Sequence, residues 1–274
     1  MRIGILTNFN NGCTEEDFII AKSFAEDGHK VDLLDFPINL DLQNVYDLLI
    51  LKNAWDLNEN TYKNYLTELD KMKAKLKQTQ CKIVSSLDGK MDFEKYGKKY
   101  LVDLFNAGYN VVPTIDNIKD IAKLPEAKIY IKKPYVSYDG FDMQEIKRNN
   151  LKNLNLNNEI LQPKLDFISE VQLYFINDKF QYALEYTPSK WPNYPTPHSF
   201  LPSKKYINQA IEIININGAS CSFNRVDFLK LNDNDMIILE FADSNPNLSL
   251  PMLDKKTLNM FLQNFKHEIY NYIK

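Results

Sequence analysis

The stretch that most constrains the fold runs from residue 225 to residue 246 and reads RVDFLKLNDNDMIILEFADSNP. Two runs rich in apolar residues flank an Asn-Asp-Asn-Asp turn, which predicts an antiparallel hairpin. Arg225 and Asp227 stand two residues apart on its first strand, and Glu240 stands between IIL and FA on its second. An unpaired carboxylate in such a run would cost on the order of several kcal/mol, so the pattern predicts a cation beside it.

The first third of the chain has a different pattern, in which strand-like runs alternate with helical ones. Strands are expected at residues 2–8, 30–36, 46–53 and 81–86, and helices at 15–28 and 57–78. This alternation is typical of a parallel α/β lobe. The turn after the first strand, TNFNNGCT, lacks the G-x-G-x-x-G fingerprint that brings a pyrophosphate to a helix N-terminus, so an oxidoreductase is disfavoured.

The rest of the chain predicts two α+β lobes. Residues 93–108 have helical spacing of their apolar side chains and end at Gly108, and residues 127–146 read as two strands around a Ser/Asp/Gly turn. Antiparallel strands are expected over 159–188, a Pro-rich loop over 189–202, and helices over 204–217 and 255–273. We therefore expect an α/β and α+β protein with an N-terminal α/β lobe at 1–90, a small lobe at 91–160 and a larger C-terminal lobe with the metal site at 161–274.

Composition excludes several partners. Lys+Arg total 33 and Asp+Glu total 36, so the net charge of −3 provides no broad basic field for nucleic acid or an anionic membrane. Cys13, Cys81 and Cys221 are odd in number and far apart, which argues against a disulfide framework and a thiolate metal site. The chain opens on a strand-like run and contains no apolar stretch of membrane length, so we expect a cytoplasmic protein.

Four short motifs follow one another in a recognisable order. They read AWD at 54–56, KKYL…GYNVVPT at 98–114, KKP…SYDG at 132–140 and QPKLDFISE at 162–170, and the hairpin with R-x-D and the later Glu comes after them. In this order and spacing the chain resembles the ATP-grasp superfamily, and within it ligases such as the cycloserine-pathway cyclo-ligase and prokaryotic glutathione synthetases. The resemblance extends over nearly the whole chain and implies an ATP-grasp fold preceded by a Rossmann-like lobe.

The resemblance also implies which residues bind ATP. Lys98 and Lys133 would clamp the α- and β-phosphates, and the turn from Ser137 to Gly140 would fold over them. The hinge from Gln162 through Lys164 to Leu165 would meet the adenine edge with its backbone. Glu170 would accept hydrogen bonds from the ribose hydroxyls.

By the same resemblance Asp227 and Glu240 would hold magnesium, and Arg225 would face the transferred phosphoryl group. Two carboxylates on neighbouring strands suit magnesium, which takes hard oxygen ligands and shares itself with water and phosphates. Two residues beyond the metal-binding Glu, relatives usually carry a further ligand, whereas this chain has Ala242. Asn245 or Asp243 would have to replace it, so the binding of a second magnesium ion is left open.

Structural interpretations compete with several of these assignments. By composition Lys98, in a lysine-rich helix, is a solvated surface residue. Arg225 and Asp227 share a strand face, where a structural salt bridge would contribute about 0–1 kcal/mol if exposed. Lys132 and Lys133 are consecutive on one strand and face opposite ways, and the position of Pro134 favours Lys133 for the phosphates.

Three further positions stay open. Trp55-Asp56 follows a strand end where α/β proteins gather ligands, although a packing Trp is equally expected. His198 is expected to be a loop residue without a role in the site rather than part of an active-site lid that excludes water. Relatives often carry a basic residue after the third strand of the last lobe, which Lys190 or Lys204 would replace here, and Ser169 stands where glycine is usual.

These features predict an ATP- and magnesium-dependent ligase that joins a carboxylate to an amine through an acyl phosphate, with ADP and phosphate as products. Its partners would be ATP and amino acid or peptide-like substrates, with a homodimer left open. Two alternatives remain: a small-molecule kinase that uses the same clamp, and a nucleotide-binding protein whose metal site has lost its chemistry at Ala242.

Overall fold

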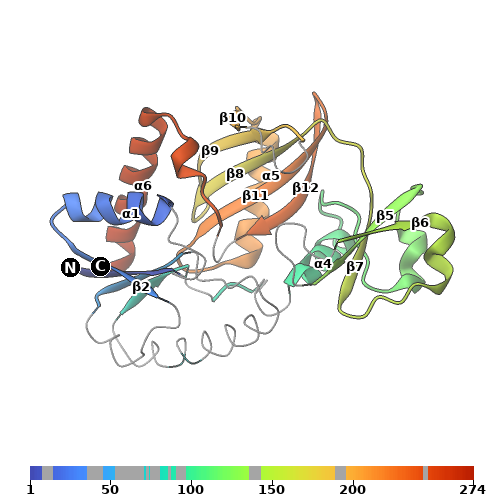
Figure 1. The fold of residues 1–274 in the computed structure, drawn as a ribbon, viewed down its shortest axis with the longest axis horizontal. Helices are drawn as coiled ribbons and strands as arrows, with labels where there is room; N and C mark the ends of the chain where they lie inside the picture. Colours follow the sequence, from blue (N-terminus) through green and yellow to red (C-terminus); the bar gives the residue numbers. More distant parts are fainter. Residues whose placement is uncertain are drawn as a thin grey trace.

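The computed structural model describes residues 1–7, 15–35, 46–52, 71, 74, 81–85, 88–90, 97–135, 143–188, 196–242 and 246–274. Within them the strands form three sheets, which lie in a row across the molecule with the largest in the middle (Figure 1). Along the chain, the sheets come in the order of the predicted lobes, so the α/β and α+β fold class is confirmed. The exact domain boundaries stay predictions. The described part of the chain contains no helix with the length and apolarity to cross a membrane.

The first sheet is parallel, as the alternation of strands and helices predicts. It consists of β1 (Arg2–Thr7), β2 (Lys30–Asp35), β3 (Leu48–Leu51) and β4 (Lys82–Val84), in the order β2-β1-β3-β4. Helix α1 (Glu15–Glu26) connects β1 to β2 and ends before Gly28, whose φ of 82° is common just after a helix. The helix predicted at 57–78 lies almost wholly outside the described residues.

The small sheet is antiparallel, with β6 (Gln144–Lys147), β5 (Ile129–Pro134) and β7 (Glu159–Pro163) in that order. The strand pair predicted at 127–146 is therefore confirmed, and the turn within it lies outside the described residues. Two 3-10 helices, η3 (Ile118–Lys123) and η4 (Arg148–Asn153), accompany the sheet. Its buried cluster contains Ile115, Leu124, Tyr130, Leu151 and Leu161.

The large sheet contains the predicted hairpin. Its strands are β10 (His198–Ser199), β9 (Lys179–Tyr186), β8 (Ser169–Ile176), β11 (Phe223–Asn232) and β12 (Asp235–Ala242), in that order and all antiparallel. Helix α5 (Lys204–Asn217) ends at Gly218 with a φ of 64°, and α6 (Lys255–Ile273) begins after Asp254, whose side chain accepts from the first amides of the helix. Both predicted helices are confirmed.

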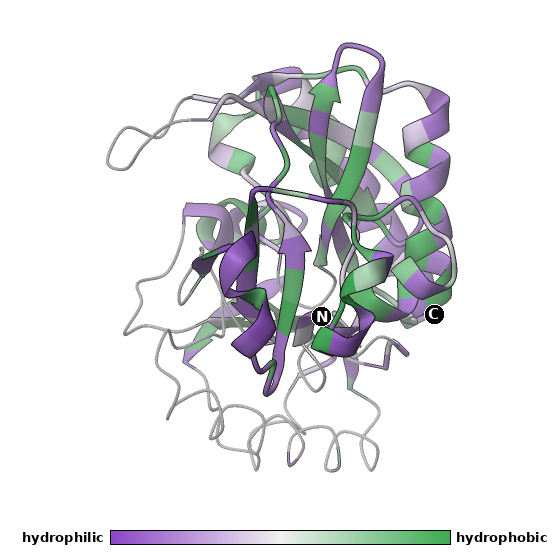
Figure 2. Ribbon diagram, turned by 90° about the vertical axis from the view of Figure 1, so that its right-hand side faces the viewer, coloured by the Kyte–Doolittle hydropathy of each residue, from purple (hydrophilic) through white to green (hydrophobic). Residues whose placement is uncertain are grey.

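Alternate residues of the large sheet face two different cores. Leu173 and Phe228 pack with α5 and with α4 (Tyr100–Asn106) on one face. Tyr174 and Tyr182 pack on the other face with β1, β3, α1 and α6, so the first lobe and the large sheet share a core. Figure 2 shows hydrophobic residues along the strands and helices that carry both hydrophobic and hydrophilic segments.

The outer edge of β12 is covered by a short extended segment. Val112 donates its backbone N–H to the carbonyl of Ile238 at 2.8 Å, and Ile238 donates its own N–H to the carbonyl of Asn110 at 3.0 Å. The Asn110 amide also donates to the carbonyl of Met236 at 2.9 Å. The last strand of the hairpin is therefore hydrogen-bonded on both sides.

Candidate nucleotide and metal site

The register of the large sheet gathers polar side chains on one face. Asp227 on β11 lies directly opposite Glu240 on β12 and opposite Gln172 on β8, so these three residues form a row across three strands, here called the polar row. Glu170, two residues before Gln172, is on the same face and accepts a hydrogen bond from the Gln172 amide at 2.9 Å. Further along the strands this face packs against the first lobe.

Arg225 grips Asp227 with two parallel hydrogen bonds. Its Nε and Nη2 donate to the two carboxylate oxygens at 2.8 Å and 2.9 Å, and Nη1 donates to the carbonyl of Asn247 at 3.3 Å. Burial alone would lower the pKa of Arg225, but the charge of Asp227 raises it. The side chain of Asp227 is 5% exposed, so this pair is buried, unlike the exposed salt bridge weighed from the sequence.

Burial also affects Asp227 itself. It raises the pKa of the carboxyl to about 7, and the charges of Glu170 and Glu240 add to the rise while Arg225 opposes it. A divalent cation beside this group would favour its ionised form. Burial and the neighbouring carboxylates thus leave Asp227 short of positive charge, so Asp227 and Glu240 would suit a hard cation. The described residues contain no group of three or more metal-binding side chains, so such an ion would complete its shell with nucleotide and water, as magnesium does.

Lys98 reaches the polar row from a tight turn. It belongs to η2 (Gly97–Lys99), where Gly97 has a φ of 56° and a Cβ would collide with the carbonyl of Tyr135. The Lys98 N–H donates to that carbonyl at 2.7 Å, and its Nζ donates to Glu240 at 3.2 Å. Lys98 is 5% exposed, so it is no solvated surface residue. Of the helix predicted at 93–108, residues 93–96 lie outside the described residues, Gly97–Lys99 form η2 and the α-helix runs over Tyr100–Asn106.

Lys132 and Lys133 face opposite ways on β5, as the two-residue period of a strand requires. Lys132 forms an ion pair with Glu159 at 2.8 Å. Lys133 lies close enough to the polar row for the charges of Glu240 and Glu170, and that of Lys98, to act on it, while burial lowers its pKa. The structure therefore gathers Lys98, Lys133, Glu170 and Glu240 near one another.

The link between β7 and β8 joins the small sheet to the large one. Gln162 is buried within β7, where its amide donates to Thr114 at 2.8 Å, and the irregular link begins only at residue 164. The Lys164 side chain is exposed and pairs with Glu145 at 2.5 Å, so a role in binding would fall to its backbone. Leu165 is partly buried.

The remaining predicted residues lie either outside the described part of the chain or on another face of the large sheet. Ser137, Gly140, Trp55-Asp56, Lys190, Asp243 and Asn245 lie outside the described residues. His198 pairs with Glu185 at 3.3 Å, and Ser169 donates to the same carboxylate, on the face of the sheet opposite the polar row. Lys204 begins α5, which also packs on that opposite face.

One feature near the site was not predicted from the sequence: Glu16 and Lys52 form a buried ion pair, with Nζ of Lys52 3.0 Å from Oε2 of Glu16. Both residues belong to the first lobe and contact the chain just after β12. The available signal was weak, because Glu16 reads as an acidic residue in the first turn of a helix, which is common. Lys52 reads as the polar end of an apolar strand.

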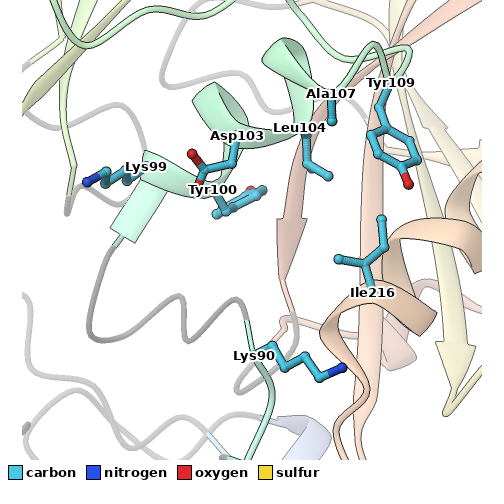
Figure 3. A pocket seen from close by; sticks show the side chains of 8 residues that line it. All are labelled: Lys90, Lys99, Tyr100, Asp103, Leu104, Ala107, Tyr109 and Ile216. Atoms are coloured by element: carbon cyan, nitrogen blue, oxygen red, sulfur yellow. The ribbon is translucent and has the colours of Figure 1, made fainter.

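Figure 3 shows a cavity of about 520 Å³ whose described lining includes no residue of the polar row. It is lined by Lys90, Lys99, Tyr100, Asp103, Leu104, Ala107, Tyr109 and Ile216. Tyr100 and Leu104 belong to the core on the opposite face of the large sheet. Tyr100 connects the two sides, because its hydroxyl accepts from the N–H of Phe241 at 2.8 Å, one residue beyond Glu240.

Comparison with known proteins identifies the fold. No protein-family model and no curated protein matches the chain. Among solved structures, D-cycloserine synthetase DcsG is similar with a TM-score of 0.70 at 16% identity, covering 97% of this chain and 100% of that one. The ATP-grasp ligase PsnB, complexed with a minimal precursor, has a TM-score of 0.67 at 13% identity, covering 97% and 98% of the two chains. The macrocyclase MdnC, bound with precursor peptide MdnA from Microcystis aeruginosa MRC, has a TM-score of 0.64 at 12% identity over 96% and 100%. The chain has the ATP-grasp fold, as its motifs predict.

Proposed function

We propose that this chain, which has the ATP-grasp fold, is an ATP-dependent ligase that joins a carboxylate to an amine through an acyl phosphate. The observation that carries the proposal is the pairing of Asp227 with Glu240 across β11 and β12, with Arg225 and Lys98 hydrogen-bonded to them. Acidic groups suited to a hard cation and basic groups suited to phosphates thus meet in one place.

Binding of ATP would use both sheets. Lys98 and Lys133 approach from two different elements and would meet the α- and β-phosphates as point charges. Ser137 and Gly140 would close over the phosphates. The adenine would lie against the backbone of Gln162, Lys164 and Leu165, and Glu170 would accept from the ribose. The partial burial of Lys133 supports this role, because a phosphate would restore the charge stabilisation that burial removes.

Arg225 would stabilise the transferred phosphoryl group. Its guanidinium is already fixed by Asp227 and the Asn247 carbonyl, so it needs no rearrangement when negative charge develops on the phosphoryl oxygens. Magnesium, held by Asp227, Glu240 and the expected ligand Asn245, would supply further neutralisation of the phosphates. The substrate carboxylate oxygen takes the γ-phosphoryl group and ADP leaves. The amine then attacks the acyl carbon, loses a proton and expels phosphate.

An amino acid or peptide-like compound is the proposed substrate class. Support comes from the solved structures of similar fold, since PsnB is complexed with a minimal precursor, MdnC is bound with a precursor peptide and DcsG is a D-cycloserine synthetase. The substrate would lie between the first lobe and the polar row. A cytoplasmic location, where ATP is supplied, belongs to the same proposal.

Ala242 favours one alternative. It lies opposite Arg225 on the face that carries Glu240, so a methyl group stands where relatives usually place a further ligand. A nucleotide-binding protein without catalysis would be consistent with that loss. Such a protein would bind ADP but release no phosphate with any substrate.

A screen of ATP hydrolysis over amino acids, short peptides and small carboxylates, with magnesium, tests the proposal. We expect phosphate release that requires both a carboxylate and an amine, and an amide product in equal amount. Asp227→Asn and Glu240→Gln should remove nearly all turnover while the proteins stay folded. Asp233→Asn is the matched control, because Asp233 lies in the turn of the same hairpin with its side chain 89% exposed.

Each outcome of the screen has a distinct meaning. Phosphate transfer to a substrate without an amine would identify a small-molecule kinase. Full activity in Asp227→Asn or Glu240→Gln would refute the assignment of the metal site. ADP binding without turnover under any condition would favour the non-catalytic alternative.

A further inference from the structure

The segment from Pro246 to Leu250 comes shortly after the proposed metal strand in the chain and has little regular structure of its own. It leads from β12 into η5 (Leu250–Met252), and Leu248 and Leu250 are fully buried. Backbone groups buried in such a segment need hydrogen-bond partners from elsewhere in the protein. In this chain the partners come from two lobes.

The first lobe supplies Glu16 and Lys52, here called the clasp. Glu16, in the first turn of α1, accepts from the N–H groups of Leu248 and Leu250, both at 3.1 Å. Lys52, just after β3, donates to the carbonyl of Pro246 at 2.7 Å and to Glu16 at 3.0 Å. The Lys52 side chain is 2% exposed and the Glu16 side chain 6%, so both are shielded from water.

The large sheet holds the same segment from its other side. Arg225 donates to the carbonyl of Asn247 at 3.3 Å, and Tyr182 donates to the carbonyl of Leu248 at 2.5 Å. The hydroxyls of Tyr174 and Tyr186 lie 3.1 Å and 2.9 Å from the Ser249 hydroxyl. Ser249 itself has a φ of 53°, a conformation that non-glycine residues adopt only where the surroundings enforce it.

A buried ion pair is a poor means of gaining stability alone. Two apolar side chains of similar volume would often stabilise the fold as much or more, because burying charges carries a desolvation penalty. Apolar side chains would not fix the direction of three backbone groups in one segment. Directional control of residues 246–250 is therefore the property that the clasp adds.

We propose that Glu16 and Lys52 are positioning residues for the metal and phosphoryl-transfer site, an inference that rests on the proposed function. The route is continuous through described contacts: the clasp fixes residues 246–250, the carbonyl of Asn247 accepts from Arg225, and Arg225 grips Asp227. The clasp also fixes Pro246, only four residues beyond Ala242 at the end of β12. The first lobe thereby sets the geometry of a site whose chemical groups all lie elsewhere.

Lys52→Met tests this role, with Lys266→Met as its matched control. Lys266 also joins α1 to another part of the fold, since it donates to Asp27 at 2.9 Å and to the carbonyl of Ser23 at 3.3 Å, but these contacts do not involve residues 246–250. Calorimetry of ADP binding over a series of magnesium concentrations provides a readout that does not depend on turnover. Urea unfolding measures the stability of both variants.

For Lys52→Met we expect the magnesium concentration for half-maximal ADP binding to rise about tenfold and kcat to fall about tenfold, the usual size of effects beyond the ligand shell. The KM for ATP and the affinity for ADP without magnesium should change by less than about twofold, because the lysines that contact phosphate are untouched. Lys266→Met should leave the magnesium dependence and kcat unchanged even where its stability falls.

Magnesium dependence and kcat at wild-type values in Lys52→Met would show that the clasp is only structural. If Lys52→Met does not fold, Glu16→Gln decides instead. This variant keeps one oxygen acceptor but turns an amide group toward Lys52 or toward a backbone N–H, so the same changes are expected, and wild-type values would overturn the inference. Wild-type protein that binds no nucleotide with magnesium would remove the proposed function, and this inference with it.

Discussion

The junction between the first lobe and the large sheet is held together differently from the small sheet. At the junction a continuous core joins β1, β3, α1 and α6 to β8 and β9, and the clasp adds buried polar contacts. Within the described part of the chain, the small sheet has a small core of five buried residues, and its ion pairs Arg148–Glu126 and Lys164–Glu145 are exposed. Exposed pairs stabilise little. From this comparison we expect Arg225, Asp227 and Glu240 to stand on the more rigid unit, and the small sheet that carries Lys133 to move more readily.

The largest expected effect concerns the rigid unit. Phe265 on α6 is 1% exposed and packs against Phe24 of α1 and Phe223 of β11, with ring centroids 5.6 Å and 4.5 Å apart. Phe265→Ala should lower the free energy of unfolding by about 3–5 kcal/mol, because it leaves a cavity between two lobes. Urea unfolding with hydrogen exchange measures it. Loss of protection in α1 without loss in β8 would break the comparison, since the two would not unfold as one unit.

The second largest effect concerns the contact between Lys98, in the predicted small lobe, and Glu240 on the large sheet. Lys98→Met would remove the cation beside Glu240, and we expect kcat/KM for ATP to fall about 100-fold, as for other donors that stabilise transferred charge. Lys99→Met is the control, because Lys99 is exposed on the neighbouring position. Equal losses in the two variants, measured by phosphate release, would contradict a specific role for Lys98.

The third effect concerns the small sheet. Lys133→Met should weaken ADP binding about tenfold, which corresponds to one charge-assisted hydrogen bond. Lys132→Met should leave the affinity unchanged, because Lys132 pairs with Glu159 on the other face of the strand. Calorimetry compares the two. A larger loss in Lys132→Met would mean that the strand presents its opposite face to the nucleotide.

The smallest effect concerns the link between the sheets. Lys164→Met removes an exposed ion pair with Glu145 and should lower stability by less than about 1 kcal/mol. ADP affinity should stay at the wild-type value, because the hinge is expected to contact adenine through its backbone. A clear loss of affinity by calorimetry would instead assign the binding role to the side chain.

Local periodicity was sufficient to predict much of this fold. The hairpin at 225–246, the parallel first lobe and the opposite orientations of Lys132 and Lys133 all follow from the period of strands and helices, which neighbouring residues determine. The ATP-grasp fold itself was predicted from the order of short motifs.

Residue burial that depends on distant contacts was harder to predict. Lys98 lies among other lysines in the sequence, and its burial results from the turn at Gly97 and the approach of Tyr135. The clasp was missed because Lys52 and Pro246 are 194 residues apart. No pattern within either segment indicates that they meet.

The cover on the outer edge of β12 also bears on how this protein behaves at high concentration. A long outer strand with free backbone groups is a template on which further copies of a chain can add and polymerise. Val111 and Val112 occupy that template from within the same molecule. The segment from Asn110 to Val112 thus covers the edge of the hairpin on which a second copy of the chain could otherwise add.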